Sequence, residues 1–314
     1  MSPLQHATTS DAALAAGSPD FVAMLDHLGS LRFSGDDAAT FLQGQLSCDL
    51  TQVSVRSSSY GAYCTSKGRM LANFLLWRDE DGLAMALSRD IAEGVRKQLS
   101  KYVLRSKVSV VDASDTLVLA GAAGEQATRS FAHIFPELPR QPGEARSVPG
   151  VGAVIRLKDG RLFAALRRPF DARARLADAR LWRWLDIRNG LPLITATTQD
   201  QFVPQMANLE LIGGVSFEKG CYTGQEIVAR AQHLGRVKRR MFLANVAAAA
   251  KAGDALYSDD LGAQASGTVV NAEPSPNGGH DLLGVVQTAS RERSTVHLGS
   301  TNGPALRFLP FPTP

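Results

Sequence analysis

The sequence predicts an α+β fold followed by a small all-β unit. Before about residue 235, hairpins and helices mix without the regular alternation that builds a parallel sheet. After residue 240, short apolar runs separated by Gly, Asn, Asp and Pro are typical of a small β domain. The 314 residues, of which 44% are hydrophobic and 20% charged, suffice for a large core. We expect a flexible leader over 1–20, an α+β unit over 21–235 and a β unit over 236–314.

The expected elements follow in order along the chain. A strand begins at Leu31, turns at Ser34-Gly35 and leads into a helix with Asp36 and Asp37 in its first turn, where negative charge is favoured. Two apolar runs joined by the turn at 79–82 predict a hairpin. The remaining expectations are a helix from Ser88 toward residue 102, strands at 108–111 and 116–120, a helix at about 124–135, a Pro-rich stretch at 136–149, a hairpin over 151–157 and 162–166, a helix at 179–188, and strands at 241–246, 266–270, 282–287 and 294–298.

Cysteine usage and hydropathy limit the class of protein. The three cysteines are few, odd in number and without a CxxC pair, which suits free thiols in a reducing cytosol. No run approaches 18 apolar residues, so no transmembrane helix is expected. The first twenty residues lack the basic start and apolar stretch of a secretory signal.

The segment KGCYTGQEIVAR, residues 219–230, is the most informative stretch. Thr223 and Glu226 have the T-x-x-E spacing of a capping box, which predicts the start of a helix. Cys221 lies just outside this N-terminus, where the helix dipole is positive, and Lys219 adds a full charge. Both charges favour a thiolate, so Cys221 is the best candidate for a reactive sulfur.

A structural interpretation stands beside the chemical one. Capping alone accounts for Thr223 and Glu226, while Gly220 and Gly224 fit simple turn positions. Free cysteines are usually buried, so an inert thiol at Cys221 is an equal alternative on local sequence.

Positive charge is concentrated in two regions. The whole chain carries +4, whereas residues 219–240 alone hold six basic residues and one acidic residue. A second, acid-free run at 97–107 holds four cations. Such patches suit an anionic ligand or an RNA backbone. For the second run, a solvated helix face is the preferred interpretation.

Several other side chains are candidates for ligand contact. Lys67 and Arg69 lie between two strand-like runs and are placed to meet an anion, although a basic turn in solvent is the alternative. Trp182 and Trp184 stand two apart on one helix, so they cannot both face one core. One is expected to pack, leaving the other to stack on an aromatic ligand.

The amides of Gln205 and Asn208 suit recognition of a heterocycle edge or, equally, the anchoring of an irregular loop. The histidine spacing predicts no metal site, and neither a phosphate loop nor a dinucleotide fingerprint is present. An iron–sulfur cluster held by these three cysteines is unsupported.

The segment FVPQMANLELIGGVSFEKGCYTGQEIVARAQHLGRVKRR, residues 202–240, resembles the signature region of the YgfZ family of folate-binding proteins. This family is related in fold to the T-protein (aminomethyltransferase) of the glycine cleavage system. The resemblance extends through FLQGQLSCDL, CTSKGRML, LSKYVLRSKV and RNGLPLI. It covers most of the chain from about residue 25 and thins over 118–176 and in the C-terminal strands.

The resemblance implies three subdomains in a ring around a central channel, the first two forming a folate-binding unit and the last a small β-barrel. It also implies tetrahydrofolate in the channel and a cytoplasmic role in assembly or repair of iron–sulfur enzymes, some of which thiolate tRNA. Those enzymes, or cluster-assembly proteins, are the expected partners.

The family cysteine corresponds to Cys221, and we expect Trp182 to stack on the pterin. The basic residues around Lys219 and Arg236–Arg240 would hold the glutamyl tail. The predicted folate contacts are Trp182, Lys219, Gly220, Tyr222, Gln225, Lys67, Arg69 and Asn208.

One difference from T-proteins bears on chemistry. In the region of KGRMLANFLLW, T-proteins carry acidic residues that assist aminomethyl transfer, but this chain has no carboxylate from Lys67 to Trp77. A group able to relay a proton is therefore missing.

The leading hypothesis is a folate-dependent accessory protein with Cys221 as its reactive residue. The second is a one-carbon transferase with an unidentified substrate. The third, weak direct contact with RNA, ranks last because the basic runs lack interleaved aromatics.

Overall fold

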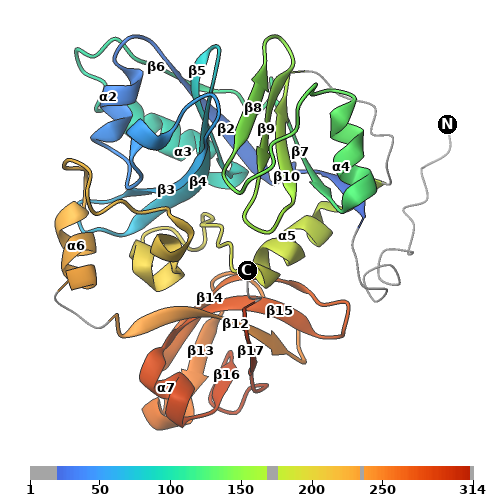
Figure 1. The fold of residues 1–314 in the computed structure, drawn as a ribbon. Coiled ribbons are helices and arrows are strands. Elements are labelled where there is room, and N and C mark those ends of the chain that lie inside the picture. The colour runs from blue at the N-terminus through green and yellow to red at the C-terminus, as the bar shows by residue number, and fades with distance from the viewer. Residues whose placement is uncertain (1–19, 168–175, 234–236, 312–314) are drawn as a thin grey trace.

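The computed structural model describes residues 20–167, 176–233 and 237–311, which form three sheets with helices packed around them (Figure 1). The first sheet consists, in spatial order, of β3 (Ser59–Cys64), β4 (Met70–Asp79), β5 (Gly82–Ser88), β2 (Leu28–Ser34) and β6 (Ser109–Asp112). The second consists of β11 (Leu176–Ala177), β1 (Phe21–Met24), β7 (Val118–Ala123), β10 (Leu162–Leu166), β9 (Gly152–Arg156) and β8 (Ala145–Val148). The third consists of β16 (Val296–Leu298), β13 (Ala255–Ser258), β14 (Ala265–Pro274), β15 (His280–Gln287), β12 (Arg239–Val246) and β17 (Arg307–Leu309).

Neighbouring strands pair antiparallel, except that β1 and β11 run parallel. The α-helices are α2 (Ala38–Gln43), α3 (Arg89–Ser100), α4 (Glu125–Ala132), α5 (Ala179–Arg188), α6 (Gln225–His233) and α7 (Thr288–Arg293). Short 3-10 turns are η1 (Leu50–Gln52), η2 (Pro204–Ala207), η3 (Leu209–Ile212) and η4 (Asp259–Leu261). Among the described residues, no helix combines the length and apolarity needed to cross a bilayer.

The first two sheets pack against each other because strand alternation gives each of them two apolar faces. In β4, Phe74 and Leu76 pack toward α2 and α3, while Leu75 and Trp77 face the second sheet. In β10 of the second sheet, Phe163 meets Trp77 with ring centroids 5.6 Å apart. The opposite face of the second sheet packs on α4. The layers are therefore helix, sheet, sheet and helix, which read from left to right in the upper half of Figure 1.

The third sheet also has one face toward the rest of the molecule. Met241 and Leu243 of β12 pack with residues of β3, β4, η2 and η3, whereas Ala244 and Val246 face the core of the third sheet itself. The chain just before β17 bonds to β16, because the Leu306 N–H donates to the Val296 carbonyl at 2.7 Å. Helix α5 lies between the second and third sheets (Figure 1).

Most sequence-based expectations for the elements are met. The mixed α and β content is confirmed, and the predicted helix at 179–188 coincides with α5. The predicted Pro-rich stretch at 136–149 contains β8, which was missed because its ARSV sequence carries little apolar signal. Ser88 precedes α3, but its hydroxyl donates to Asp90 Oδ1 and makes no cap bond to the helix backbone.

Strands β1, β11, β13 and β17 were also missed. Each spans four residues or fewer, too short for periodicity to reveal. Residues 1–19 of the predicted leader lie outside the described residues, but Asp20 accepts hydrogen bonds from two N–H groups of α4. The boundaries predicted near residues 20 and 235 stay predictions.

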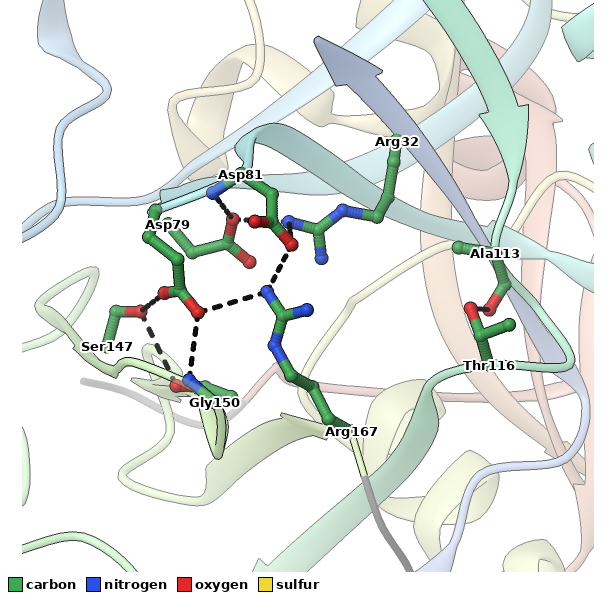
Figure 2. A network of polar contacts seen from close by, with 10 residues as sticks. Arg32, Asp79, Asp81, Ala113, Thr116, Ser147, Gly150 and Arg167 are labelled. Carbon is green, nitrogen blue, oxygen red and sulfur yellow. Dashed lines mark hydrogen bonds and ion pairs between the residues drawn. The ribbon is translucent and has the colours of Figure 1, made fainter.

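Three consecutive carboxylates stand where β4 turns into β5, and two of them, Glu80 and Asp81, connect the first two sheets (Figure 2). Asp79 pairs with Arg32 of β2 inside the first sheet. Arg167, which follows β10 of the second sheet, pairs with Asp81 and places Nη2 3.1 Å from Glu80 Oε1. The hydrogen bond from Arg167 lowers the pKa of Asp81. The turn between β8 and β9 adds to the network, since the Gly150 N–H donates to Glu80 Oε1 at 3.0 Å.

We predict that Arg167→Met lowers the free energy of unfolding by about 1 kcal/mol at low salt, because two partly exposed carboxylates lose their partner. Asp81 has a lowered pKa in the folded state, so its contribution is present at neutral pH and disappears as pH falls through that pKa. Urea denaturation in low and high salt measures both effects. Arg129→Met, which removes an exposed ion pair with Glu125, is the control. An equal loss in both variants would contradict a linking role for Arg167.

Candidate functional site

The KGCYTGQE segment packs directly on the β3–β4 turn. Gly224 has φ +83°, and a Cβ there would lie 2.4 Å from the carbonyl oxygen of Thr65. Gly68 in the turn lies against Gly224 and Ile227, with φ +68°. Both positions need glycine, since L side chains rarely adopt this backbone conformation. The two glycines therefore bring the segment before α6 into contact with the predicted Lys67-Gly68-Arg69 turn.

Lys219 anchors this segment to α2 and to the loop that follows it. Its ammonium donates to the carbonyl oxygens of Gln43, Leu46 and Cys48 at 2.7, 2.7 and 2.9 Å. The residue is 8% exposed, and burial lowers the pKa of Lys219. Its Nζ also lies 5.1 Å from the ring centroid of Tyr222.

The prediction that Lys219 holds the glutamyl tail of a ligand is therefore corrected. An ammonium group has three hydrogens, and each has a carbonyl acceptor within the protein. The carbonyls do not neutralise the ammonium, so the predicted effect of its charge on Cys221 stays a prediction. Of the basic residues in Arg236–Arg240 that were also predicted for the tail, Arg236 lies outside the described residues, and Arg240 pairs with Glu210.

The reciprocal contact at the start of α6 differs from the predicted capping box. Glu226 is exposed and pairs with Arg230, one turn along the helix. The Tyr222 N–H instead donates to Oε1 of Gln225 at 3.3 Å. Among hydrogen bonds of the described residues, none joins Thr223 to Glu226. The helix begins at Gln225, one residue later than that spacing requires, whereas the observed pair of Tyr222 and Gln225 lies one residue before the predicted pair.

The three cysteines occupy two kinds of environment. Cys48 and Cys64 are each 1% exposed, and burial raises the pKa of each thiol to about 12. Cys221 is exposed, so the interpretation of it as a buried thiol is wrong. Its reactivity stays a prediction. Gly220 beside it stands free, since a Cβ there would meet no atom within 4 Å.

Tyr222, by contrast, is 7% exposed and packs inward. Asn208 and Gln205 anchor an irregular loop, which was the predicted alternative to recognition of a heterocycle edge. Asn208 has a left-handed backbone, and its Nδ2 donates to the carbonyl of Met241 in β12 at 2.8 Å. Gln205 Nε2 donates to the Val228 carbonyl of α6 at 2.7 Å. These amides hold η2 and η3 between α6 and the third sheet.

A pocket lies between the first two sheets, away from the KGCYTGQE segment. It consists of two cavities of about 80 and about 200 Å³ that share Tyr60, Leu75 and Leu157. We call the two together the inter-sheet pocket. Trp182 and Asp186 line the smaller cavity, and α5 supplies both. Lys158 lines the larger one.

Asp186 is the one carboxylate among the described residues that line this pocket, and sequence reasoning missed it. Its Oδ1 accepts a hydrogen bond from Arg161 Nη2 at 2.6 Å, and Arg161 also pairs with Asp159 at 2.6 Å. Burial raises the pKa of Asp186 to about 6, although the Arg161 cation acts in the opposite direction. Asp186 stands four residues after Trp182, so helical spacing places both on one face of α5. That spacing was the signal available in the sequence.

The two tryptophans of α5 take different positions. Trp182 is 2% exposed and packs on the backbone of β7, since a Cβ at Gly121 would lie 2.3 Å from its ring. The Arg161 guanidinium covers the Trp182 ring, with Cζ 4.0 Å from the ring centroid. Trp184 reaches the third sheet, where its Nε1 donates to Asp281 Oδ2 at 2.8 Å. Stacking of Trp182 on a ligand stays a prediction.

The pocket wall on β4 carries an amide. Asn73 is 5% exposed, and its Nδ2 donates to the Pro192 carbonyl at 2.7 Å. Its Oδ1 accepts from the Ile194 N–H at the same distance. Both ends of the amide are therefore engaged with the backbone, and neither can take up a proton at neutral pH.

Many cations of the two basic runs have acidic partners or polar contacts. Lys97 pairs with Glu93, and Lys107 lies 3.5 Å from Asp36. Arg240 pairs with Glu210. The contacts of Lys97 and Lys107 support the interpretation of the run at 97–107 as a solvated helix face. Lys67 and Arg69 line a separate cavity of about 500 Å³ beside α6.

Comparison with known proteins gives relatives and a structural neighbour. The chain is 36% identical over 228 residues to the tRNA-modifying protein YgfZ of Edwardsiella ictaluri, covering 69% of each chain. It is 36% identical over 231 residues to the protein of the same name from Shigella boydii, covering 70% of each. The glycine cleavage system aminomethyltransferase T from Bartonella henselae superposes with a TM-score of 0.77 at 18% identity, over 97% of this chain and 89% of that one, which establishes the fold. No protein-family model matches the chain.

We predict that Lys219→Met lowers the free energy of unfolding by about 2–4 kcal/mol, because three carbonyls lose their donor in a buried site. Lys238→Met, at an exposed position near the start of β12, is expected to change it by less than about 0.5 kcal/mol. Chemical denaturation of the two variants compares them directly. If both variants are equally stable, Lys219 does not anchor the segment.

Proposed function

This chain belongs to the YgfZ family, and from that premise we propose that it binds tetrahydrofolate in the inter-sheet pocket and serves iron–sulfur enzymes as an accessory protein. The name of the relatives, tRNA-modifying protein, supports a role related to tRNA modification. The shared fold with an aminomethyltransferase of the glycine cleavage system is consistent with a folate ligand.

The observation that carries this proposal is the polar arrangement of the inter-sheet pocket. A pterin presents adjacent N–H donors, and a carboxylate accepts such a pair. Asp186 supplies a carboxylate whose raised pKa, about 6, still leaves it ionised at neutral pH. Tyr60, Leu75 and Leu157 provide an amphipathic wall where the two cavities meet. Lys158, at the other end, offers a cation for the glutamyl carboxylates.

The role with iron–sulfur enzymes rests on the family resemblance and on Cys221. This thiol is exposed, so a partner can reach it, and it sits in a segment whose position is fixed by Lys219. We propose Cys221 as the reactive or redox residue through which client enzymes are served. Enzymes that thiolate tRNA are the client class that agrees with the relatives' name.

A one-carbon transferase is the second candidate, and the β4 wall of the pocket argues against an aminomethyl mechanism of the kind that the resemblance implies for T-proteins. Proton transfer needs a group that titrates near the reacting atom. Asn73 cannot fill this role, and the sequence from Lys67 to Trp77 offers no carboxylate. Product formation from tetrahydrofolate and a one-carbon donor by the purified protein would restore this candidate.

We also propose the finer architecture that the resemblance implies, with three subdomains in a ring and the third sheet closed into a barrel. The bond from Leu306 to Val296 supports closure, because it joins the chain entering β17 to the opposite edge strand. A cytoplasmic location is part of the same proposal. The three free thiols support it, since a reducing compartment keeps cysteines unpaired.

We predict that tetrahydrofolate quenches tryptophan fluorescence saturably and that Asp186→Asn weakens the affinity at least about tenfold, the loss expected for a hydrogen bond to a charged group. The ionised carboxylate accepts both donors, so wild-type affinity falls as pH is lowered through about 6. The Asn variant loses this pH dependence. Asp115→Asn, at an exposed site, is the matched control. Equal affinity of wild type and Asp186→Asn would place folate elsewhere, and no quenching would remove it.

We predict that Cys221→Ser folds and binds tetrahydrofolate like the wild type but fails to support client enzymes. The hydroxyl preserves the size and polarity of the side chain while removing the thiolate. Complementation of cells lacking this protein, read out as the content of thiolated tRNA, measures the loss. Thr223→Ser in the same loop is the control and should complement fully. Full complementation by Cys221→Ser would remove the thiol from the mechanism.

A further inference from the structure

A second cavity, of about 500 Å³, lies between the β3–β4 turn, α6 and the third sheet. It shares no lining residue with the inter-sheet pocket. Lys67 and Arg69 come from the β3–β4 turn, and Arg239 is the first residue of β12. We call this space the basic cavity. The elements that surround it are distant in sequence and are brought together by the contact of Gly68 with Gly224 and Ile227.

The charges around the basic cavity have no acidic partners in its wall. Three cations line it, and none of its described lining residues is Asp or Glu. Arg69 donates to the backbone carbonyl of Asp200 at 3.0 Å, which orients the side chain without neutralising it. Among the ion pairs of the described residues, none involves Lys67, Arg69 or Arg239. Uncompensated like charges around one space raise its potential for anions.

A third cavity shows how basic residues in a cavity wall can be satisfied by partners within the protein. This space of about 520 Å³ is also lined by two arginines, Arg156 and Arg161. Arg161 pairs with Asp159 and Asp186, and Arg156 donates to the carbonyls of Pro139 and Gly160, both at 2.7 Å. Arg161 is therefore neutralised by carboxylates within the protein. In the basic cavity, by contrast, none of the three cations has a carboxylate partner among the described residues.

The remaining wall of the basic cavity is largely apolar. Phe202, Val203, Met206, Ile227 and Val285 contribute apolar surface, and Thr268 adds a hydroxyl. Pockets that combine apolar walls with a few convergent polar groups are typical of small-molecule sites. Arginine suits oxyanions in particular, because its planar fork donates two parallel hydrogen bonds.

We propose that the basic cavity is a second ligand site, separate from the folate pocket, for an amphipathic anion: an apolar body that carries a phosphate or carboxylate group. The apolar body contacts Phe202, Met206 and Val285, while the oxyanion meets Lys67, Arg69 and Arg239. The site depends on the contact between the β3–β4 turn and α6, so a ligand there links the CTSKGRML and KGCYTGQE segments.

The test uses 1-naphthyl phosphate as the probe in isothermal titration calorimetry with the full chain. Two analogues separate its chemistry: 1-naphthol lacks the charge, and inorganic phosphate lacks the apolar body. The probe is expected to bind at least about tenfold more tightly than either, since both parts contribute. Titration of 1-naphthoate then distinguishes a phosphate site from a carboxylate site, and either result fits the proposal. No saturable binding of either naphthyl anion would overturn it.

The location is tested with the triple variant Lys67→Gln, Arg69→Gln and Arg239→Gln. It is expected to lose at least about tenfold in affinity for the probe, because charge-assisted hydrogen bonds are removed. The control replaces one exposed lysine and two exposed arginines elsewhere, Lys101→Gln, Arg105→Gln and Arg129→Gln. Single Lys67→Gln, at an exposed turn, repeats the test if the triple variant is unstable. Equal affinity of test and control variants would overturn the proposal.

A further arm separates this site from the folate pocket. Probe binding is expected to be unchanged in Asp186→Asn and in the presence of saturating tetrahydrofolate. Displacement of the probe by tetrahydrofolate, together with loss of binding in Asp186→Asn, would place the probe in the inter-sheet pocket and refute a second site. Failure of folate binding with intact probe binding would instead affect only the proposed function.

Discussion

The position of the KGCYTGQE segment depends on one buried ammonium. Lys219 donates to three carbonyls of the chain around α2, and burying a charge is tolerated only when its donors are satisfied in this way. The contact fixes the segment to α2 and the loop after it, while Gly224 fixes it to the β3–β4 turn. Cys221 lies between these two attachments, exposed on a backbone that is held at both ends. The direction of α6, and hence one wall of the basic cavity, follows from the same attachments.

The inter-sheet pocket follows from a different constraint, the double-sided burial of β4. Because Leu75 and Trp77 face the second sheet while Phe74 and Leu76 face α2 and α3, a shift of the strand by one residue would exchange the two sets and disrupt the packing on both faces. The β4–β5 turn therefore falls where its carboxylates meet Arg167 (Figure 2). Further along the same strand, Asn73 reaches the backbone that follows α5. The ionic network at one end and the amide at the other hold the sheets on either side of the pocket.

The sequence was sufficient to predict those helices and strands whose signals are local. Helix α5 ends before Gly190 and Pro192, and the β4–β5 hairpin is marked by its acidic turn, so both were predicted. The sequence was insufficient to predict the position of a side chain whose partners lie far along the chain. Nothing near Lys219 indicates that its charge points inward, because its acceptors lie more than 170 residues away. Asp186 was missed for a similar reason, since its raised pKa arises from burial between sheets.

The inter-sheet pocket differs in its chemical groups from the region of Cys221 and the basic cavity. In the inter-sheet pocket, Asp186 is hydrogen-bonded to Arg161, and the wall on β4 carries the amide of Asn73, which is bound to backbone and cannot relay a proton. This arrangement suits a binding site better than a site of group transfer. The exposed thiol lies in the KGCYTGQE segment, and Lys67 and Arg69 lie in the β3–β4 turn on which that segment packs. Under the proposed function, the inter-sheet pocket therefore holds the ligand, while Cys221 is accessible to a partner protein at the surface.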